Sequence, residues 1–318
     1  YKNITPILDV SDKVVWHVRA TMKSVFSKMG IEGNERRTIK VASGKLNYPK
    51  APFKTLKVKE LYNIVWLVCE SWRADMVNKN IMPNTDAFGN ENTRFLNHYS
   101  SGNGTRMGLF GQFYGLYGLY WFDMLEAQKG PVLFDILIEN GYQKKAFTSA
   151  RFSYPEFDKT LFSRFSKDEL QSFSEGEGWE RDKKNVTDLI DFMSAAKEPF
   201  FSFMFFESDH ANYYFPKEEI IEKNYLENFD YLVTDIPSNI VGIKNRYINA
   251  SHYLDSQLGQ VIDYLKTSGK LENTIVIITG DHGEEFLEKG RWGHNSTFSQ
   301  EQIRVPLIIH HPAKKIMP

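Results

Sequence analysis

The sequence predicts an α/β fold in which a central, mostly parallel sheet is flanked by helices, and two observations carry this prediction. Short, continuous apolar runs are bounded by polar residues, which is typical of strands that are buried on both faces. These runs alternate with segments of helical periodicity, an order that favours parallel strands joined by crossover helices. The chain has 318 residues, of which 42% are hydrophobic, so it can form one large core.

The first 60 residues are expected to form an N-terminal arm or linker. They carry many Lys and Arg among isolated apolar residues, some of which fall near helical spacing: Val14, Val15, Val18 and Met22. This spacing fits an ordinary surface helix at least as well as a helix that contacts a membrane. Residues 43–52 contain two prolines and predict an irregular linker. The chain opens at Tyr1 in polar sequence, without a Met, so we expect a fragment.

Five apolar runs are predicted to be strands. In chain order they are Asn63–Cys69, Lys144–Ser149, Phe200–Phe206, Thr274–Thr279 and Val305–His310. One helix is predicted over Val132–Asn140, where Gly141 provides a stop, and another over Asn245–Thr267, ahead of Gly269. The sequence therefore predicts a single domain over residues 61–318.

Composition and charge exclude several classes of protein. The formal net charge is −1, so no overall basic field points to nucleic acid. The single cysteine, Cys69, excludes an intrachain disulfide and a cysteine-based zinc cluster. No stretch approaches the roughly 18 apolar residues of a membrane span. Aromatic residues make up 14% of the chain, which fits both an aromatic core and a lipid-facing or sugar-facing surface.

Carboxylates and imidazoles follow three of the predicted strands. Ligands collect beyond the carboxyl ends of strands in open parallel sheets, so these positions are where chemistry is expected. A lone Glu in such a place is usually solvated, and a lone His is usually structural. Their coincidence at three strand ends favours a divalent-metal site with oxygen and nitrogen ligands. The residues are Glu70; Glu207, Asp209 and His210; and Asp281, His282 and Glu284, followed by His294.

The glycine-rich segment Ser100–Gly111 offers a nucleophile. Thr105 lies where a loop could open a helix, and there its hydroxyl would meet backbone N–H groups that suit a phosphate or sulfate. A bound metal could activate this hydroxyl, and Arg106 could stabilise charge on the transferred group. The alternative is a flexible glycine loop in which Thr105 simply caps the helix, and the local sequence alone favours that alternative.

Taken together, these residues resemble the alkaline phosphatase/sulfatase superfamily from about Asn63 to the end of the chain. Glu70–Asp75 (ESWRAD) looks like the first metal-ligand strand end of that family. The stretch Ile248–Pro306 resembles its carboxyl-side signature, with TIVIITGDHGE, a GHN element and IRVPLI. The resemblance implies an alkaline phosphatase-like sandwich. It also implies membrane helices before residue 1 and a fold that continues beyond Pro318, so that the domain is truncated here.

The branch of the superfamily is indicated by Thr105. Sulfatases proper carry a Cys or Ser in a C/S-x-P-x-R motif, whereas this chain has Thr105-Arg106-Met107-Gly108. A threonine is similar to lipoteichoic acid synthases and phosphoethanolamine transferases. That similarity implies a metal held by Glu70, Thr105, Asp281 and His282, with His210 and His294 on the substrate phosphate. The loop Asn97–Leu116 looks closest to the inner-membrane PbgA/YejM type, although that type is expected to carry Asp at position 70.

The sequence thus predicts a metal-dependent phosphotransferase or phosphodiesterase with Thr105 as nucleophile. Its substrate would be a phospholipid or lipopolysaccharide head group, and its cofactor Mn²⁺, Zn²⁺ or Mg²⁺. The expected location is the bacterial inner membrane, with this domain facing the periplasm and no nucleic-acid partner. Two alternatives stay open: a lipid-sensing regulatory module of the PbgA type, and a sulfuric ester hydrolase, against which the missing Cys and Pro count.

Overall fold

The fold is that of a computed structural model, which describes residues 46–51 and 60–313 of the chain. Contacts within the chain divide it into residues 1–48 and 49–318, and every helix and strand described below lies in the second unit. The helical spacing predicted around Val14–Met22 falls outside the described residues. Residues 46–51 contain neither helix nor strand, as expected for a linker.

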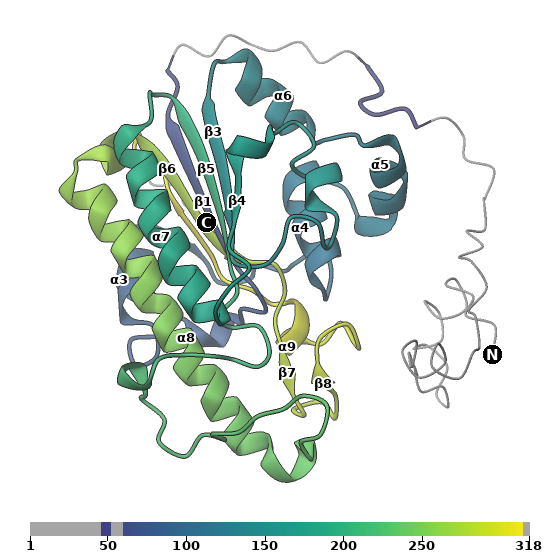
Figure 1. The fold of residues 1–318 in the computed structure, drawn as a ribbon, viewed down its shortest axis with the longest axis vertical. Helices are drawn as coiled ribbons and strands as arrows, with labels where there is room; N and C mark the ends of the chain where they lie inside the picture. The colour runs from purple at the N-terminus through teal and green to yellow at the C-terminus, as the bar shows by residue number, and fades with distance from the viewer. Residues whose placement is uncertain (1–45, 52–59, 314–318) are drawn as a thin grey trace. The chain divides into compact units, whose positions relative to one another are not determined.

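Among the described residues, a seven-stranded sheet has the spatial order β2-β9-β6-β1-β5-β3-β4 (Figure 1). Strands β1, β3, β4, β5 and β6 pair in parallel, whereas β9 runs antiparallel to both of its neighbours, β2 and β6. The predicted α/β fold with a mostly parallel sheet is therefore confirmed. The strands are β1 Asn63–Cys69, β2 Thr93–Phe95, β3 Gln143–Thr148, β4 Leu170–Ser172, β5 Phe200–Phe206, β6 Thr274–Gly280 and β9 Leu307–His310.

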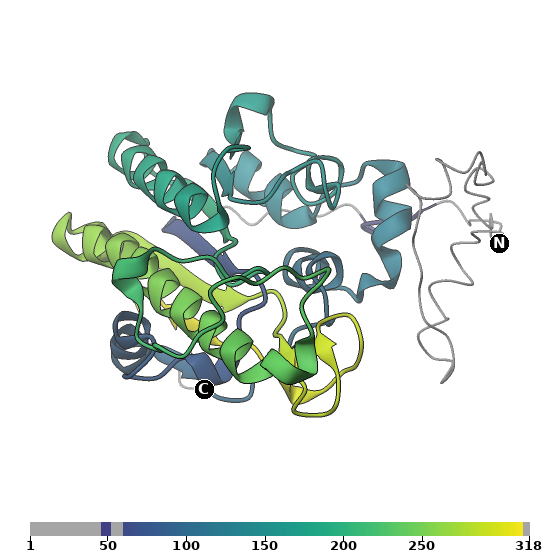
Figure 2. The ribbon, with the colours of Figure 1, turned by 60° about the horizontal axis from the view of Figure 1, so that its bottom comes forward.

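Helices cover both faces of the sheet because alternate side chains of each buried strand point to opposite faces. In β5, the ring of Phe200 lies 5.9 Å from that of Phe192 in α7 on one face, and the ring of Phe201 lies 5.4 Å from that of Phe134 in α6 on the other. Figure 2 shows these layers. The first face carries α3 Pro83–Glu91, α7 Gly178–Ala195 and α8 Ile236–Thr267; the second carries α4 Thr105–Tyr114, α5 Trp121–Ala127 and α6 Val132–Glu139.

The bounds of β3, β6 and α6 differ from the sequence predictions by one residue, and those of β9 and α8 differ by more. The last strand, β9, begins at Leu307 instead of Val305. Pro306 has no N–H to donate to the ladder, and its carbonyl accepts instead from the Thr279 hydroxyl at 2.8 Å. Helix α8 begins nine residues before Asn245, at Ile236, with a proline in its first turn. The added residues include Ile236, Ile240 and Ile243 at helical spacing, and these pack against the core, so the apolar stripe of α8 begins earlier than the prediction placed it.

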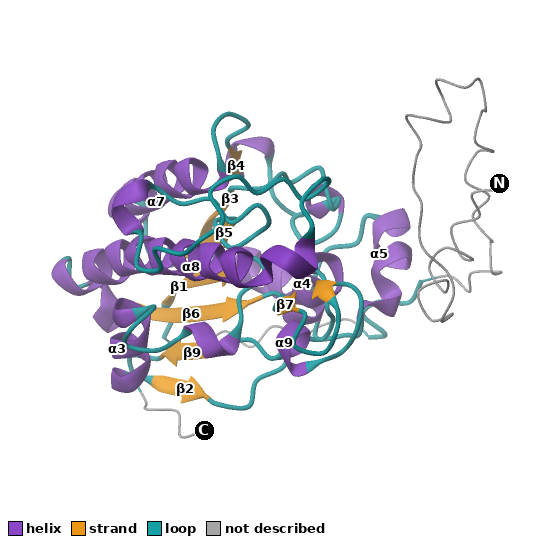
Figure 3. Ribbon diagram, turned by 90° about the horizontal axis from the view of Figure 1, so that it is seen from below, coloured by secondary structure: helices purple, strands orange, loops and turns teal. Residues whose placement is uncertain are grey.

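The carboxyl ends of the parallel strands meet the start of α4, the small hairpin of β7 Glu285–Phe286 and β8 Trp292–Gly293, and the short helix α9 Gln300–Ile303. Figure 3 shows β6 pointing toward this group. This edge is therefore where side chains from distant parts of the sequence converge. In the described ranges, no helix combines the length and apolarity that crossing a bilayer requires.

The start of α3 depends on one buried carboxylate of α8. Asp255 accepts hydrogen bonds from the backbone N–H groups of Asn84 and Thr85 at 2.9 and 2.8 Å, which have no partner within their own helix. Asp255→Ala should therefore lower the free energy of unfolding by about 1–3 kcal/mol, measured by urea denaturation. Asp263→Ala, on the exposed face of the same helix, is the control and should change stability by less than about 0.5 kcal/mol.

Candidate functional site

Two neighbouring strands bring the predicted metal ligands together. β1 pairs with β6 in a register that sets Cys69 opposite Gly280, so the next residues, Glu70 and Asp281, leave the sheet at the same level. The backbone N–H of Asp281 still donates to the carbonyl of Cys69 at 3.3 Å. Glu70 is 5% exposed, and Asp281 and His282 are fully buried. The site therefore lies at the end of the sheet core and not on a solvated loop.

The three side chains converge on one point. Nε2 of His282 lies 2.9 Å from Oε1 of Glu70 and 3.4 Å from Oδ2 of Asp281. One ligand atom from each residue falls within 4.8 Å of the others. Two carboxylate oxygens and one imidazole nitrogen in such proximity form a ligand set suited to a divalent cation such as Zn²⁺ or Mn²⁺.

Backbone groups orient the inner ligands. Oδ1 of Asp281 accepts from the N–H of Ser71 at 3.0 Å and of His282 at 2.8 Å, whereas its Oδ2 is buried and has no hydrogen-bond partner. Nδ1 of His282 lies 2.9 Å from the carbonyl of Gly283, which can only accept, so Nδ1 carries the proton and Nε2 faces the cluster. A buried carboxylate oxygen without a partner is costly, and a cation would supply its missing partner. The residues therefore fit a metal.

The charges of the cluster perturb one another. Burial alone would raise the pKa of Glu70, but the hydrogen bond from His282 and the nearby histidines lower it. Burial and the Glu70 charge raise the pKa of Asp281. Burial opposes protonation of His282, yet the two carboxylates hold its pKa above the usual value. Without a cation, a proton thus occupies the place that a metal would fill.

Thr105 is the first residue of α4, and Gly104, not Thr105, is its N-cap. The hydroxyl of Thr105 lies 3.0 Å from Oε1 of Glu70 and 3.3 Å from Nε2 of His282. The alternative in which Thr105 caps the helix is therefore wrong, since its hydroxyl contacts the buried cluster. A Cβ at Gly108 would lie 2.0 Å from the carbonyl oxygen of Asp281, so α4 reaches the strand end because this residue is a glycine.

Two further histidines border the cluster. Nδ1 of His294 lies 2.9 Å from Oε2 of the buried Glu284, and its ring centroid is 4.3 Å from that of His282. The ring of His210 lies 6.1 Å from the ring of His294. His210 follows β5 and His294 follows β8, so two segments that are far apart in sequence bring these imidazoles to the border of the cluster.

The structure does not bring every candidate into the cluster. Arg106 pairs with Glu156 at 2.9 Å, and its guanidinium stacks on Trp121 at 5.3 Å from the ring centroid. Glu207 pairs with Arg181, and Asp209 accepts from the hydroxyl of Ser251 at 2.9 Å. Glu207 and Asp209 thus hold the surrounding loops and helices.

Sequence reasoning named Glu284 only as one of the carboxylates of a possible metal site, and it missed Ser71 and Ser100 altogether. Glu284 orients His294, the N–H of Ser71 binds Asp281, and the hydroxyl of Ser100 donates to the carbonyl of Asp281. The position of Glu284 after a strand was a signal, but its partner was not visible in the sequence. The contacts of Ser71 and Ser100 depend on strand and loop geometry and leave no residue pattern.

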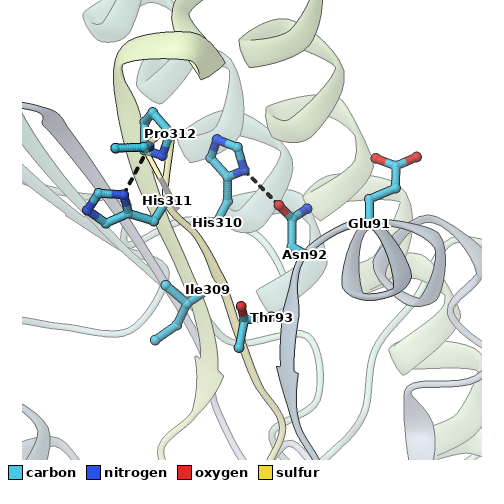
Figure 4. Close-up of a pocket in the computed structure, with 8 residues that line it drawn as sticks. Glu91, Asn92, Thr93, Ile309, His310, His311 and Pro312 are labelled. Atoms are coloured by element: carbon cyan, nitrogen blue, oxygen red, sulfur yellow. Dashed lines mark hydrogen bonds between the residues drawn. The ribbon is translucent and has the colours of Figure 1, made fainter. Parts of the chain in front are cut away.

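A hollow of about 250 Å³ lies at the opposite end of the strands (Figure 4). It is lined by residues of α3, β2 and β9, and Nδ1 of His310 lies 2.7 Å from Oδ1 of Asn92 there. His310 pairs with Val276, near the start of β6, whereas Asp281 follows the end of β6. This hollow is therefore separate from the cluster around Thr105.

Sequence comparison relates the chain to the sulfatase family and to an inner membrane protein. Residues 62–315 match the family described as Sulfatase. The chain is 30% identical over 235 residues to the inner membrane protein YejM of Salmonella typhimurium, a match that covers 73% of this chain and 34% of YejM. It therefore spans about a third of the length of that relative.

Structural comparison shows the same fold in phosphoethanolamine transferases. The C-terminal periplasmic domain of EptC from Campylobacter jejuni superimposes with a TM-score of 0.63 at 17% identity, covering 79% of each chain. A zinc complex of the corresponding domain of EptC from Escherichia coli gives a TM-score of 0.60 at 16% identity, covering 80% of this chain and 74% of that one. At these identities the likeness shows the fold alone.

The close approach of α4 to β6 makes Gly108 a sensitive position. Gly108→Ala should push the first turn of α4 away from Asp281, because the added carbon would meet backbone that cannot yield. We expect about 1–3 kcal/mol of destabilisation by urea denaturation. At Gly89 in α3 the nearest atoms are the ends of the Ile308 and Arg94 side chains, so Gly89→Ala is the control and should cost less. If Gly108→Ala and Gly89→Ala were equally stable, the contact between Gly108 and the carbonyl of Asp281 would not position α4.

Proposed function

The chain belongs to the sulfatase family, and we propose that it is a metal-dependent phosphotransferase or phosphodiesterase that acts on phospholipid or lipopolysaccharide head groups through Thr105. One observation carries the proposal: the Thr105 hydroxyl contacts Glu70 and His282, two members of a buried carboxylate–imidazole cluster. A hydroxyl at a helix start beside such a cluster suits nucleophilic attack on phosphorus.

Glu70, Thr105, Asp281 and His282 would hold the metal, which we propose to be Mn²⁺, Zn²⁺ or Mg²⁺. Mixed oxygen and nitrogen ligation favours the first two. A bound divalent cation would lower the pKa of the Thr105 hydroxyl and offset the negative charge of a phosphate. The unpartnered Oδ2 of Asp281 supports this assignment, since it points into the cluster without a hydrogen bond.

The proposed reaction has two halves. In the first, Oγ1 of Thr105 loses its proton to solvent water and attacks phosphorus, so that a Thr–O–P bond forms as the bond to the leaving oxygen breaks. In the second, water or an acceptor hydroxyl attacks the phosphothreonine and frees Thr105. His210 and His294 would bind phosphate oxygens and protonate the leaving group. Glu284 supports this role for His294, because it fixes the orientation of the ring.

Arg106 is the weaker part of this assignment. Its pairing with Glu156 directs its charge to a neighbouring loop. We propose that Arg106 stabilises charge at the transferred group only if a substrate phosphate displaces Glu156 from it.

We propose that the domain faces the periplasm of a bacterium and is anchored in the inner membrane by a helical part that precedes it. YejM is named as an inner membrane protein, and the solved relatives are periplasmic domains, which supports this location. Anchored in this way, the domain would have the phosphate esters of lipid head groups close to Thr105. The phosphoethanolamine transferases among the structural relatives favour the same class of substrate.

A second candidate function is a lipid-sensing regulatory module. The observation that favours it is sequence identity, which is 30% to YejM but 17% to the transferase domain from Campylobacter jejuni. A sensor would keep the fold and the metal site but would show almost no turnover. Hydrolysis of a generic phosphodiester such as bis(p-nitrophenyl) phosphate separates the two functions.

Removing the nucleophile tests the enzyme directly. Thr105→Ala should reduce phosphodiester turnover at least about 10³-fold in the presence of Mn²⁺ or Zn²⁺, because no hydroxyl is left to attack phosphorus. Thr187→Ala, in which an exposed hydroxyl bound to its own helix is lost, is the control and should keep full activity. Turnover in Thr105→Ala equal to that of the unmodified chain would refute the assignment.

Metal binding should depend on Asp281. Asp281→Asn removes the charge of the carboxylate whose Oδ2 lies buried in the cluster without a hydrogen-bond partner, and we expect bound metal to fall from about one per chain to near zero by mass spectrometry of metal content. Because the pKa values of Asp281 and His282 are raised, metal must displace protons, and affinity should rise with pH. The exposed Asp263→Asn variant should retain metal; equal retention in both variants would place the metal elsewhere.

A further inference from the structure

The imidazole of His210 is held differently from the other two imidazoles of the candidate site. Nδ1 of His282 lies against the carbonyl of Gly283, and Nδ1 of His294 lies against the carboxylate of Glu284. Among the described residues, neither ring nitrogen of His210 has a hydrogen-bond partner, and its ring lies 6.1 Å from that of His294. The position of His210 therefore depends on the backbone that carries it.

That backbone begins with a turn that a buried carboxylate of α7 holds. Asp182 is fully buried and accepts from the N–H of Glu207 at 3.0 Å and from the N–H of Ser208 at 2.9 Å. The hydroxyl of Ser208 donates to the same carboxylate. The carbonyl of Glu207 in turn accepts from the N–H of His210 at 3.0 Å. Asp182 is thus connected to His210 through a single residue, Glu207.

The preceding residue of α7 holds the same turn from its outer side. Arg181 pairs with the carboxylate of Glu207, and its Nε donates at 2.6 Å to the carbonyl of Ser149, which follows β3. We call Arg181 and Asp182 the α7 clamp. Because the clamp binds both the main chain and the side chain of Glu207, the turn after β5 cannot shift without breaking these contacts.

The chain after His210 is anchored in the core. The N–H of Tyr213 donates to the carbonyl of His210 at 2.7 Å, and the fully buried ring of Tyr213 stacks on Phe229 at a centroid distance of 5.8 Å. Between these points, Asp209 accepts from the hydroxyl of Ser251 in α8 at 2.9 Å. His210 therefore lies between two fixed points, and the α7 clamp is the one at the end of β5.

We propose that Arg181 and Asp182 are positioning residues that keep the imidazole of His210 beside that of His294. Positioning of this kind rests on the proposed function, in which both imidazoles bind the substrate phosphate. None of the hydrogen bonds and ion pairs of the clamp involves a proposed metal ligand, so the clamp acts on the reaction through His210. A displacement of about 1 Å in a reacting group can cost up to about 100-fold in rate.

Three variants test the clamp. Asp182→Asn keeps the shape of the side chain, but an amide accepts at only one oxygen, and its NH2 would face a backbone N–H. Arg181→Gln is the second variant: the Arg181 side chain is 17% exposed, so its replacement is less disruptive to folding than a change at Asp182. The matched control is Asp191→Asn, which makes the same replacement on the exposed face of the same helix.

The first measurement needs no turnover. With isotope-labelled histidine rings and Zn²⁺ present, the whole chain should show a nuclear Overhauser effect between the ring protons of His210 and His294. We expect this effect to be unchanged in Asp191→Asn, weakened in Arg181→Gln and lost in Asp182→Asn. The melting temperature shows whether each variant is folded. Bound Zn²⁺ should equal that of the unmodified chain, because the clamp does not contact the metal cluster.

The second measurement is kcat/KM for bis(p-nitrophenyl) phosphate. It should fall at least about tenfold in Asp182→Asn and about threefold in Arg181→Gln, and it should not change in Asp191→Asn. When His210→Ala is already present, Asp182→Asn should cause no further loss, because the clamp acts through this imidazole. A general loss of structure would lower kcat/KM by the same factor with and without His210.

Several outcomes would overturn the proposal. They are a folded Asp182→Asn variant that keeps the effect between His210 and His294, an unmodified chain that lacks it, or an equal loss of kcat/KM with and without His210. If Asp182→Asn does not fold, an unchanged effect in Arg181→Gln overturns the proposal instead. If the unmodified chain shows no turnover but Asp182→Asn loses the effect, the proposed function fails while the positioning of His210 stands.

Discussion

The pairing of β1 with β6 is the constraint on which the candidate site depends. Its register sets Cys69 opposite Gly280, and the residues after them therefore enter the same buried volume. The two carboxylates in this volume repel each other, and all three side chains lose their hydration. Both costs must be offset by hydrogen bonds or by positive charge. Part of the compensation comes from backbone N–H groups on Asp281, and part from the contact between His282 and Glu70. A divalent cation would supply the remaining positive charge that the two carboxylates need.

The second requirement is the close contact of α4 with the end of β6. A helix that carried a side chain at position 108 could not approach the carbonyl of Asp281, and the Thr105 hydroxyl would then stand away from Glu70. The glycines of Ser100–Gly111 thus do more than make a loop flexible. They let a helix start, with its free N–H groups, lie against a charged strand end, which is a suitable place for a phosphate.

The loops that follow the strands provide the residues that border the cluster. His294 is oriented by Glu284, whereas His210 comes from the segment after β5, so the side of the site that carries these two imidazoles is built from separate loops.

The sequence by itself determined the class of fold, the strands β1, β5 and β6, and the residue types at their carboxyl ends, because burial on both faces leaves continuous apolar runs that need no partner to be recognised. It also indicated that a helix could open at Thr105, and the structure places the start of α4 there. Only the tertiary structure decided that the Thr105 hydroxyl contacts Glu70 and does not cap α4, that Glu284 holds His294, and that Arg106 pairs with Glu156. The reason is physical: strand and helix formation follow from local patterns, whereas these side-chain contacts, between residues 10 to 50 positions apart, depend on strand register and helix packing.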